Sequence, residues 1–437
     1  MAELSSDPKG LELEDFVAAN LVSRGCYVET GIKERNPEDI LELDIVWTDY
    51  SVEPPIANPV EVKSGDWGLG DVFKFYGWTK YLGLAPGTFV HKERCGRLSQ
   101  DALDHVAART GIKFLHLPDP SEAGKLFKSQ GLPELVNEHL PEIWRYSFWA
   151  QRRLLRVINE CMKRGVCKGT LPLAKSYYQL INDGVFFIQD VRERVGELVD
   201  EHFEHHGLAA SVAYEMESGT IELKDPPPTN TFRKAYFYGE AFPVQTCLYL
   251  AHRARLYLLK AIVDYWLSKT RGEIQPSNIK LGNVSVDLTS GRLTPAMATA
   301  VEELSHAASF RQFPLFWQVF LWSWGGFLFK DRLAEQYEEL SKETGVRQDE
   351  IPIALSAFDK LFPVDDGWFR EPMNDSRKVL ILMPAAMRGI GAYRRLLCEG
   401  IKEYGQLGYK DDTTPRIIQD HNSGARLLDC REEELVK

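Results

Sequence analysis

Cysteine is scarce in this chain of 437 residues, and no two cysteines form a Cys-x-x-Cys pair. The seven present are Cys26, Cys95, Cys161, Cys167, Cys247, Cys398 and Cys430. This odd and dispersed set argues against a disulfide framework and favours a reducing compartment. The first ten residues are polar and acidic, so no secretory signal peptide is visible there. We therefore expect a cytoplasmic protein.

Positive charge is also in short supply, because the formal net charge is −11. Residues 1–120 hold 12 Lys and Arg against 20 Asp and Glu, a formal charge of −8, and the rest of the chain carries the remaining −3. Such a chain lacks the broad basic field of a free-standing, high-affinity binder of duplex nucleic acid. Binding of a polyanion should therefore depend on local basic patches, on the second region or on a partner.

Several enzyme signatures are missing as well. The sequence contains no Walker loop, no helicase motif, no Ser-His-Asp grouping and no internal repeat. Its 44% hydrophobic and 26% charged residues are typical of a globular protein. The length is sufficient for two or three domains, each with a sizeable core.

One stretch without charge, residues 312–329, approaches the length of a membrane span. Pro314, Gln318 and a pair of glycines interrupt it, and residues 330–332 carry mixed charges that give no orientation signal. We expect a buried core helix or a partner-facing surface here rather than insertion into a membrane. A membrane-associated protein built around this segment is the alternative.

What the sequence does contain is an acid and a lysine on one apolar strand. Residues 59–63 read Pro-Val-Glu-Val-Lys. Side chains alternate across a strand with a period of two, so Glu61 and Lys63 share one face. Val60 and Val62 fill the opposite, buried face. The carboxylate and the ammonium group are therefore expected side by side at a strand end.

Upstream, a second strand-like run over residues 41–47 carries Asp44 among apolar residues. The polar connection between the two runs, residues 48–58, contains two prolines and favours antiparallel neighbours. Still further upstream, residues 11–23 show helical spacing of apolar side chains, and Glu14 lies on this predicted helix.

This order of elements and acids resembles the PD-(D/E)xK, or restriction-endonuclease-like, nuclease superfamily. The resemblance covers about the first quarter of the chain and lies in spacing and context. It implies an α/β domain with a central mixed sheet flanked by helices. The remaining elements of that core would be a helix over 71–81, a strand over 88–91, a helix over 98–109 and a strand over 112–116.

The resemblance also implies roles for individual residues. Asp44 and Glu61 would hold Mg²⁺ or Mn²⁺ together with the backbone carbonyl of Val62. Glu14, which matches the helix-borne acid of the resolvase-like and Mrr-like branches, would contribute directly or through water. Lys63 would orient the attacking water and stabilise developing negative charge. Hard cations take such oxygen ligands, and an ammonium group suits that catalytic role.

Two points in this assignment stay open. Asp39 could replace Asp44 if the strand begins earlier, although the apolar residues after Asp44 continue the strand directly. A Glu-x-Lys pair on a strand is more often a solvated ion pair than a catalytic one, and only the combined motif outweighs that reading. The tight downstream cysteine group of iron–sulfur nucleases is missing, so we expect no cluster.

The predicted helix after the lysine departs from the RecB-like branches, because it lacks their glutamine. It carries Lys74, Tyr76 and Lys80 instead. These side chains are weak candidates for substrate contact, since exposed helix lysines are usually just solvated.

After residue 120 the pattern changes to long amphipathic helices, so we predict a nuclease-like domain over 1–120 and a mainly helical regulatory or recognition region over 121–437. The three prolines at 226–228 suggest a subdomain break near 225–230. A basic helix over 142–164 carries Arg152, Arg153 and Arg156, which would contact phosphate or form a solvated face.

Other expected elements of this region are helices over 185–206, 243–269 and 391–404, a hairpin over 212–223 and a strand over 379–383. His202, His205 and His206 gather at the end of the first of these helices. They could capture a metal, but helix C-termini also favour histidine through capping and the macrodipole.

Together these features predict a metal-dependent endonuclease, with DNA favoured over RNA by analogy with the family. The restrained charge and the large second region suggest a gated effector of a bacterial defence system. The architecture resembles effectors that pair with short prokaryotic Argonautes, and a protein partner or an oligomer could form through the helical region. The alternative is an inactive nuclease fold that serves as a scaffold or as a nucleic-acid-binding module with such a partner.

Overall fold

The computed structural model describes residues 4–34, 38, 40–96, 98–165, 175–176, 190–205, 242–274, 278–281, 284–287, 293–363, 368–370, 379–382 and 388–400. The described chain falls into two compact units that divide between Trp149 and Ala150, within helix α5 (Leu140–Lys163). We call them the N-terminal and C-terminal units. The predicted boundary at residue 120 stays a prediction.

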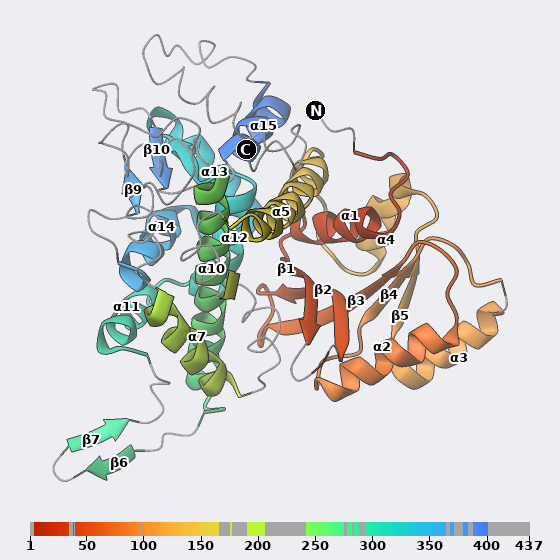
Figure 1. Ribbon diagram of the computed structural model, residues 1–437, viewed down its shortest axis with the longest axis horizontal. Helices are drawn as coiled ribbons and strands as arrows, with labels where there is room; N and C mark the ends of the chain where they lie inside the picture. Colours follow the sequence, from red (N-terminus) through yellow and green to blue (C-terminus); the bar gives the residue numbers. More distant parts are fainter. Residues whose placement is uncertain are drawn as a thin grey trace. The chain divides into compact units, whose positions relative to one another are not determined.

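Among the described residues of the N-terminal unit, five strands form one mixed sheet in the order β1-β2-β3-β4-β5 (Figure 1). The first three strands are antiparallel neighbours, and β3, β4 and β5 run parallel. This confirms the expected mixed sheet. The strands are β1 (Tyr27–Glu34), β2 (Leu41–Asp49), β3 (Ile56–Lys63), β4 (Thr88–His91) and β5 (Lys113–His116).

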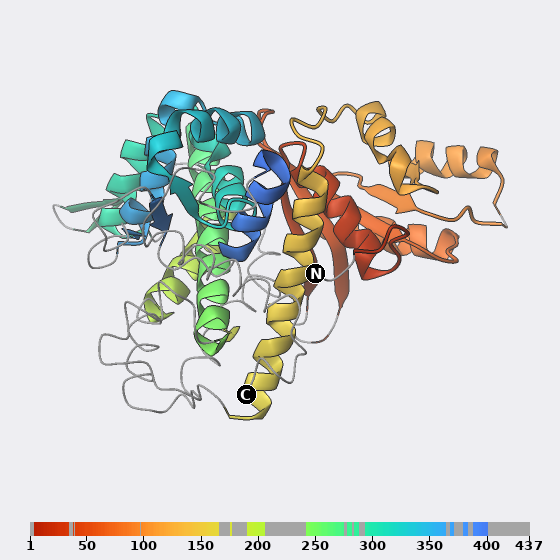
Figure 2. The same cartoon turned by 90° about the horizontal axis from the view of Figure 1, so that it is seen from above.

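Helices cover both faces of this sheet (Figures 1 and 2). On one face, α2 (Leu69–Tyr81) and α3 (Gln100–Thr110) bury Phe75 and Leu103 against Phe89 of β4. On the other, Val17 of α1 (Leu11–Val22) and Phe127 of α4 (Ala123–Ser129) lie beside side chains of β3, β4 and β5. The short 3₁₀ helix η1 (Pro120–Glu122) precedes α4.

Local sequence signals set the helix ends in this unit. The backbone N–H of Gly68 donates to Asp71 Oδ2 at 2.9 Å, which caps the start of α2. Ser99 Oγ accepts from the N–H of Ala102 at 3.2 Å at the start of α3, and Gly111 ends that helix with a φ of +75°. Helices α2 and α3 and strands β4 and β5 all lie within a few residues of their predicted ranges.

The described part of the C-terminal unit is mainly helical, as predicted. The second half of α5 belongs to this unit, and α10 is the longest described helix that lies wholly within it. The other described helices and 3₁₀ helices follow here together with α10: α7 (Val191–His205), α10 (Phe242–Thr270), α11 (Pro295–Ser305), α12 (Phe313–Trp322), α13 (Leu333–Thr344), α14 (Ile351–Leu361), α15 (Arg388–Glu399), η3 (Phe310–Gln312), η4 (Lys330–Arg332) and η5 (Gln348–Glu350). Its described strands are β6 (Asn278–Leu281), β7 (Val284–Asp287), β8 (Phe327–Phe329), β9 (Phe369–Arg370) and β10 (Val379–Leu382). They form a hairpin, β6-β7, and a small antiparallel sheet, β8-β10-β9.

The uncharged segment 312–329 forms the core of this unit. Every residue of α12 and of β8 is buried. The ring of Trp317 stacks on Phe358 of α14 with 3.8 Å between centroids, and its indole N–H donates to the carbonyl of Ala354 at 2.9 Å. The segment is thus the buried core helix of the prediction. In the part of the chain that is described, no helix combines the length and the apolar character that crossing a membrane requires.

Some predicted elements differ from the structure or lie beyond what it describes. Helix α15 ends at Glu399 rather than near 404, because Gly400 adopts a φ of +66° that interrupts the helix. His202 is buried with its ring 5.1 Å from that of Phe362. The hairpin at 212–223, the prolines at 226–228, Asp39, His206 and the side chain of His205 lie outside the described residues.

Candidate active site

The register of two antiparallel strands brings the predicted acids together. Ile45 of β2 pairs with Val60 of β3. Asp44 precedes Ile45 and Glu61 follows Val60, so Asp44 and Glu61 also lie across from each other. Their side chains point to the face of the sheet opposite that of Ile45 and Val60. Glu61 is 5% exposed and Asp44 is half-buried. Both carboxyl groups come from the sheet rather than from flexible loops.

Lys63 shares the face of Glu61, as the alternation of side chains requires. Its Nζ lies 2.6 Å from Glu61 Oε1, and its side chain is 30% exposed. The contact joins the last two same-face positions of β3. The ammonium group therefore reaches solvent at the strand end while it neutralises one oxygen of a buried carboxylate.

Asp44 is tied to the backbone of the neighbouring strand. The N–H of Val62 donates to Asp44 Oδ2 at 2.8 Å, just beyond the last described β2–β3 pair. A strand residue directs its N–H and its C=O to the same side, so the carbonyl of Val62 also lies on the side of β2. A metal ion held by Asp44 and Glu61 would need the carbonyl of Val62 on this side.

Glu14 approaches the site because α1 begins beside the end of β3. The N–H of Gly10, which precedes α1, donates to Ser64 Oγ at 3.0 Å, and Ser64 directly follows Lys63. Glu14 lies in the first turn of this helix and is half-buried. Its negative charge raises the pKa of Asp44, so the two carboxyl groups interact.

The electrostatics are those of a site crowded with negative charge. Burial, together with the charges of Glu61 and Glu14, raises the pKa of Asp44 to about 8. Burial likewise raises the pKa of Glu61, although the hydrogen bond from Lys63 opposes the rise. Burial by itself lowers the pKa of Lys63, but the hydrogen bond and charge of Glu61 and the charge of Asp44 outweigh it, so that pKa is raised. A bound cation would relieve the repulsion among the carboxylates.

The donor set fits a small hard cation. Glu61 Oε2 is buried and has no hydrogen-bond partner among the described residues. Leaving such an oxygen unpaired costs about 1–3 kcal/mol, which coordination would recover. The described residues contain no group of three or more His, Cys, Asp and Glu side chains close enough to share a metal. Mg²⁺ typically takes one or two carboxylates and keeps several waters, so Asp44 and Glu61 suffice, with Glu14 farther out.

Among the predicted substrate contacts of α2, Lys74 acts electrostatically on Glu61. Its charge lowers the pKa of Glu61, while Asp71 on the same helix raises it. Lys74 Nζ also lies 4.4 Å from the centre of the Trp78 ring. Lys80 Nζ lies 5.4 Å from the ring centre of Tyr76.

The predicted basic residues Arg152, Arg153 and Arg156 lie on the part of α5 that belongs to the C-terminal unit. Their contact with substrate stays a prediction.

Two histidines at the same sheet edge were not among the predicted site residues. Lys63, His91 and His116 are register partners across the parallel strands β3, β4 and β5, so they form one row on one face. The two imidazole rings stack with 5.1 Å between centroids. Burial lowers the pKa of both histidines. The available signal was that each ends an apolar strand, as Lys63 does.

His91 is the more enclosed of the two. It is 4% exposed, its Nδ1 lies 3.0 Å from the carbonyl oxygen of Glu93, and its ring centroid lies 4.8 Å from that of Trp67. The indole N–H of Trp67 donates to the same carbonyl at 2.8 Å. Trp67 thus covers His91 and leaves His116 as the more accessible of the two histidines.

No protein-family model, no curated protein and no solved structure matches this chain. The case for the site therefore rests on the side-chain geometry described above.

Proposed function

We propose that this protein is a metal-dependent nuclease that hydrolyses phosphodiester bonds in nucleic acid. The single observation that carries the proposal is the meeting of Asp44, Glu61 and Lys63 at the adjoining ends of two strands, with the buried Oε2 of Glu61 unpaired among the described residues. Like charges gathered in a buried site call for a cation, and the lysine beside them suits phosphate chemistry. DNA is favoured over RNA by the resemblance alone.

The roles of the chain's own residues follow from their positions. Asp44, Glu61 and the carbonyl of Val62 would hold Mg²⁺ or Mn²⁺, and Glu14 would support it directly or through water. When bound, such an ion polarises a phosphoryl oxygen and lowers the pKa of a water molecule. Lys63 would donate hydrogen bonds to the phosphate and to the attacking water, because its side chain is partly exposed beside Glu61.

We further propose that cleavage is gated, as in effectors of bacterial defence. The N-terminal region carries excess negative charge, so it should bind nucleic acid weakly without help from the C-terminal unit or from a partner such as a short prokaryotic Argonaute. A gate of this kind would keep cleavage slow in the absence of the partner. Metal binding, however, should not require the gate.

The test combines cation binding with cleavage. Thermal unfolding of the native chain would be followed with Mg²⁺, with Mn²⁺ and with EDTA, and plasmid, linear and single-stranded DNA and RNA would be incubated under each condition. We expect both cations to raise the unfolding temperature and Glu61→Gln to abolish the rise. Lys63→Met should keep cation binding but lower cleavage by about 10² or more, the usual scale for loss of one group that stabilises transition-state charge.

The chain offers a matched control on the same sheet. Lys33 Nζ lies 2.8 Å from Glu42 Oε1 across β1 and β2, in an exposed ion pair. Lys33→Met and Glu42→Gln should leave both cation binding and cleavage unchanged. Equal cleavage by the native chain and Lys63→Met would identify a contaminant, and a cation effect that survives in Glu61→Gln would refute the proposed metal site.

A scaffold without catalytic activity is the second candidate. The observation in its favour is that Lys63 already neutralises Glu61, and that the described residues contain no three-ligand metal group. A scaffold would bind nucleic acid or a partner with no response to Mg²⁺. The cation-binding test above separates the two functions even if the trigger for cleavage is missing.

A further inference from the structure

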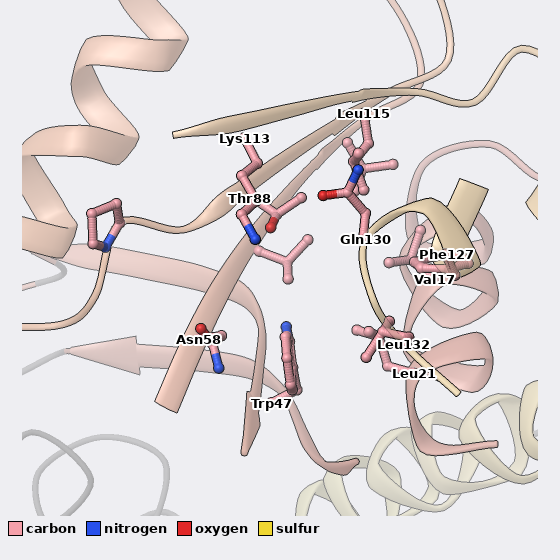
Figure 3. A pocket seen from close by; sticks show the side chains of 13 residues that line it. Val17, Leu21, Trp47, Asn58, Thr88, Lys113, Leu115, Phe127, Gln130 and Leu132 are labelled. Atoms are coloured by element: carbon pink, nitrogen blue, oxygen red, sulfur yellow. The ribbon is translucent and has the colours of Figure 1, made fainter. Parts of the chain in front are cut away.

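A pocket of about 110 Å³ opens in the N-terminal unit on the sheet face opposite the carboxylates (Figure 3). Its floor is made by β2 to β5, and its walls by α1, by α4 and by the segment after α4. Val60, Thr88 and Lys113 form one row across the parallel strands, three residues before the row of Lys63, His91 and His116. The pocket is therefore separate from the candidate active site in both face and position along the strands.

Apolar side chains line close to half of the pocket surface. Val17 and Leu21 of α1 and Phe127 of α4 form one side, and Val90 and Leu115 form the floor. An apolar cavity of about 150 Å³ is known to hold a benzene ring. A volume of this order therefore accommodates one ring or a short branched chain, and little more.

Four polar side chains converge on the space between these apolar residues. In Figure 3 the ends of Lys113, Thr88 and Gln130 point toward the centre of the pocket, and the indole nitrogen of Trp47 faces them from across the pocket. Each of these side chains can donate a hydrogen bond, and the lysine adds a positive charge. No acidic side chain is among the described residues that line the pocket.

We propose that this pocket binds a small organic monoanion, a carboxylate carried on an apolar body of about one ring. The apolar walls would cover the body, and Lys113 would pair with the carboxylate, with Thr88 and Trp47 as further donors. Apolar side chains that cover the body of a ligand, with a small number of placed polar groups that fix its orientation, are a common pattern of small-molecule recognition. The inference is independent of the nuclease function, because no proposed metal or catalytic side chain lines the pocket.

The experiment uses the full chain and ligand-observed NMR titration with benzoate and 3-methylbutanoate as carboxylate probes. Benzamide is the neutral match for benzoate, and adenine tests a nucleobase ligand. We expect benzoate to bind with a dissociation constant of about 1 mM, which is realistic for so few atoms. Benzamide should bind about tenfold or more weakly, because it lacks the charge that Lys113 would meet.

Two variants test the assignment of donors. Lys113→Met keeps the length of the side chain and should weaken benzoate binding about tenfold or more, with no effect on benzamide. Thr88→Val keeps the shape of threonine and should weaken benzoate by about threefold to tenfold. Lys125→Met, at an exposed lysine of α4 outside the pocket lining, is the matched control and should bind as the native chain does. Thermal unfolding would verify that all three variants are folded.

Equal binding of benzoate and benzamide, or full binding of benzoate by Lys113→Met, would overturn the proposed anion site. Tighter binding of adenine than of benzoate, unaffected by Lys113→Met, would replace the ligand class with a neutral base. If no probe binds with a dissociation constant below about 20 mM, the pocket is not a ligand site of this kind, because the binding free energy per non-hydrogen atom would then be very small.

Discussion

Each of the two units buries charge, but in opposite ways. In the C-terminal unit, Arg394 is 1% exposed and pairs with Glu343 and Glu339, while its guanidinium lies 3.9 Å from the centre of the Trp324 ring. Opposite charges thus neutralise each other within the core. In the N-terminal unit, Asp44 and Glu61 bring like charges together at the end of a strand, and one lysine offsets only part of them.

This difference separates a structural cluster from a candidate functional one. A buried pair of opposite charges is complete in itself, and removal of either partner leaves an uncompensated charge. A buried group of like charges is complete only when a proton or a cation joins it. The raised pKa of Asp44 means that a proton joins this group in the metal-free protein. A bound metal ion would take the place of that proton.

The largest expected effect falls on the structural cluster. Arg394→Met should lower the free energy of unfolding by about 3–5 kcal/mol, because it leaves the buried carboxylate of Glu343 without its partner. Lys63→Met should cost less, about 1–3 kcal/mol, because the ammonium group is partly solvated although the carboxylate of Glu61 is buried. Urea unfolding of both variants measures the contrast. A loss at Lys63 as large as that at Arg394 would remove the distinction drawn here.

The pH dependence of the metal-free protein is the next largest effect. Asp44 has an ordinary pKa of about 3.9 when unfolded, and burial, together with the charges of Glu61 and Glu14, raises it to about 8 in the folded protein. Between these values the folded state holds a proton that the unfolded state has lost, so the free energy of unfolding falls as the pH rises and levels off above pH 8.

From pH 6 to pH 8 this contribution amounts to about 2 kcal/mol. It should appear as the difference between the native chain and Asp44→Asn in urea unfolding with EDTA. If native and variant proteins lose stability in parallel over this range, Asp44 does not titrate as inferred.

Addition of Mg²⁺ should act against that loss. A cation at ten times its dissociation constant stabilises the folded state by about 1.4 kcal/mol. The gain should grow from pH 6 to pH 8, because the cation competes with a proton for the carboxylate of Asp44. Titration of Mg²⁺ into the native chain and Glu61→Gln, followed by thermal unfolding, provides the measurement. Stabilisation that is independent of pH and of Glu61 would place the cation elsewhere.

The smallest effect is expected at the exposed pair of β1 and β2. Lys33→Met and Glu42→Gln should each change the free energy of unfolding by less than about 0.5 kcal/mol, because solvent screens this contact. Neither should alter the response to Mg²⁺ or to pH. Their urea curves calibrate the effect of losing a surface ion pair on the same sheet. A cation response that changes in either variant would show that the cation binds near β1.

Much of the N-terminal sheet could be predicted because its signals are local. Alternation of apolar residues defines β2 and β3, and Ser99 and Gly111 mark the ends of α3. In the C-terminal unit the uncharged run at 312–329 indicated core, and α12 and β8 are indeed buried. The end of α15 was missed because the left-handed conformation of Gly400 is a choice that a helical pattern does not reveal.

The candidate site was predictable only in part. That Glu61 and Lys63 share a face follows from strand periodicity, which two residues of one segment suffice to show. The stacked histidines were missed because their alignment with Lys63 depends on the parallel pairing of three strands that are distant in sequence. The pocket above Thr88 and Lys113 depends on the same pairing, and on the helices that cover that face.

By itself, the sequence determined which residues alternate on each strand, where most helices begin and which segment is apolar enough for a core. These are properties of neighbours along the chain, set by backbone periodicity and solvation. Only the tertiary structure decided that Asp44 reaches the N–H of Val62, and that Glu14 acts on Asp44 from a helix anchored to Ser64. The reason is that burial and the distances between charges arise when strands and helices distant in sequence pack together.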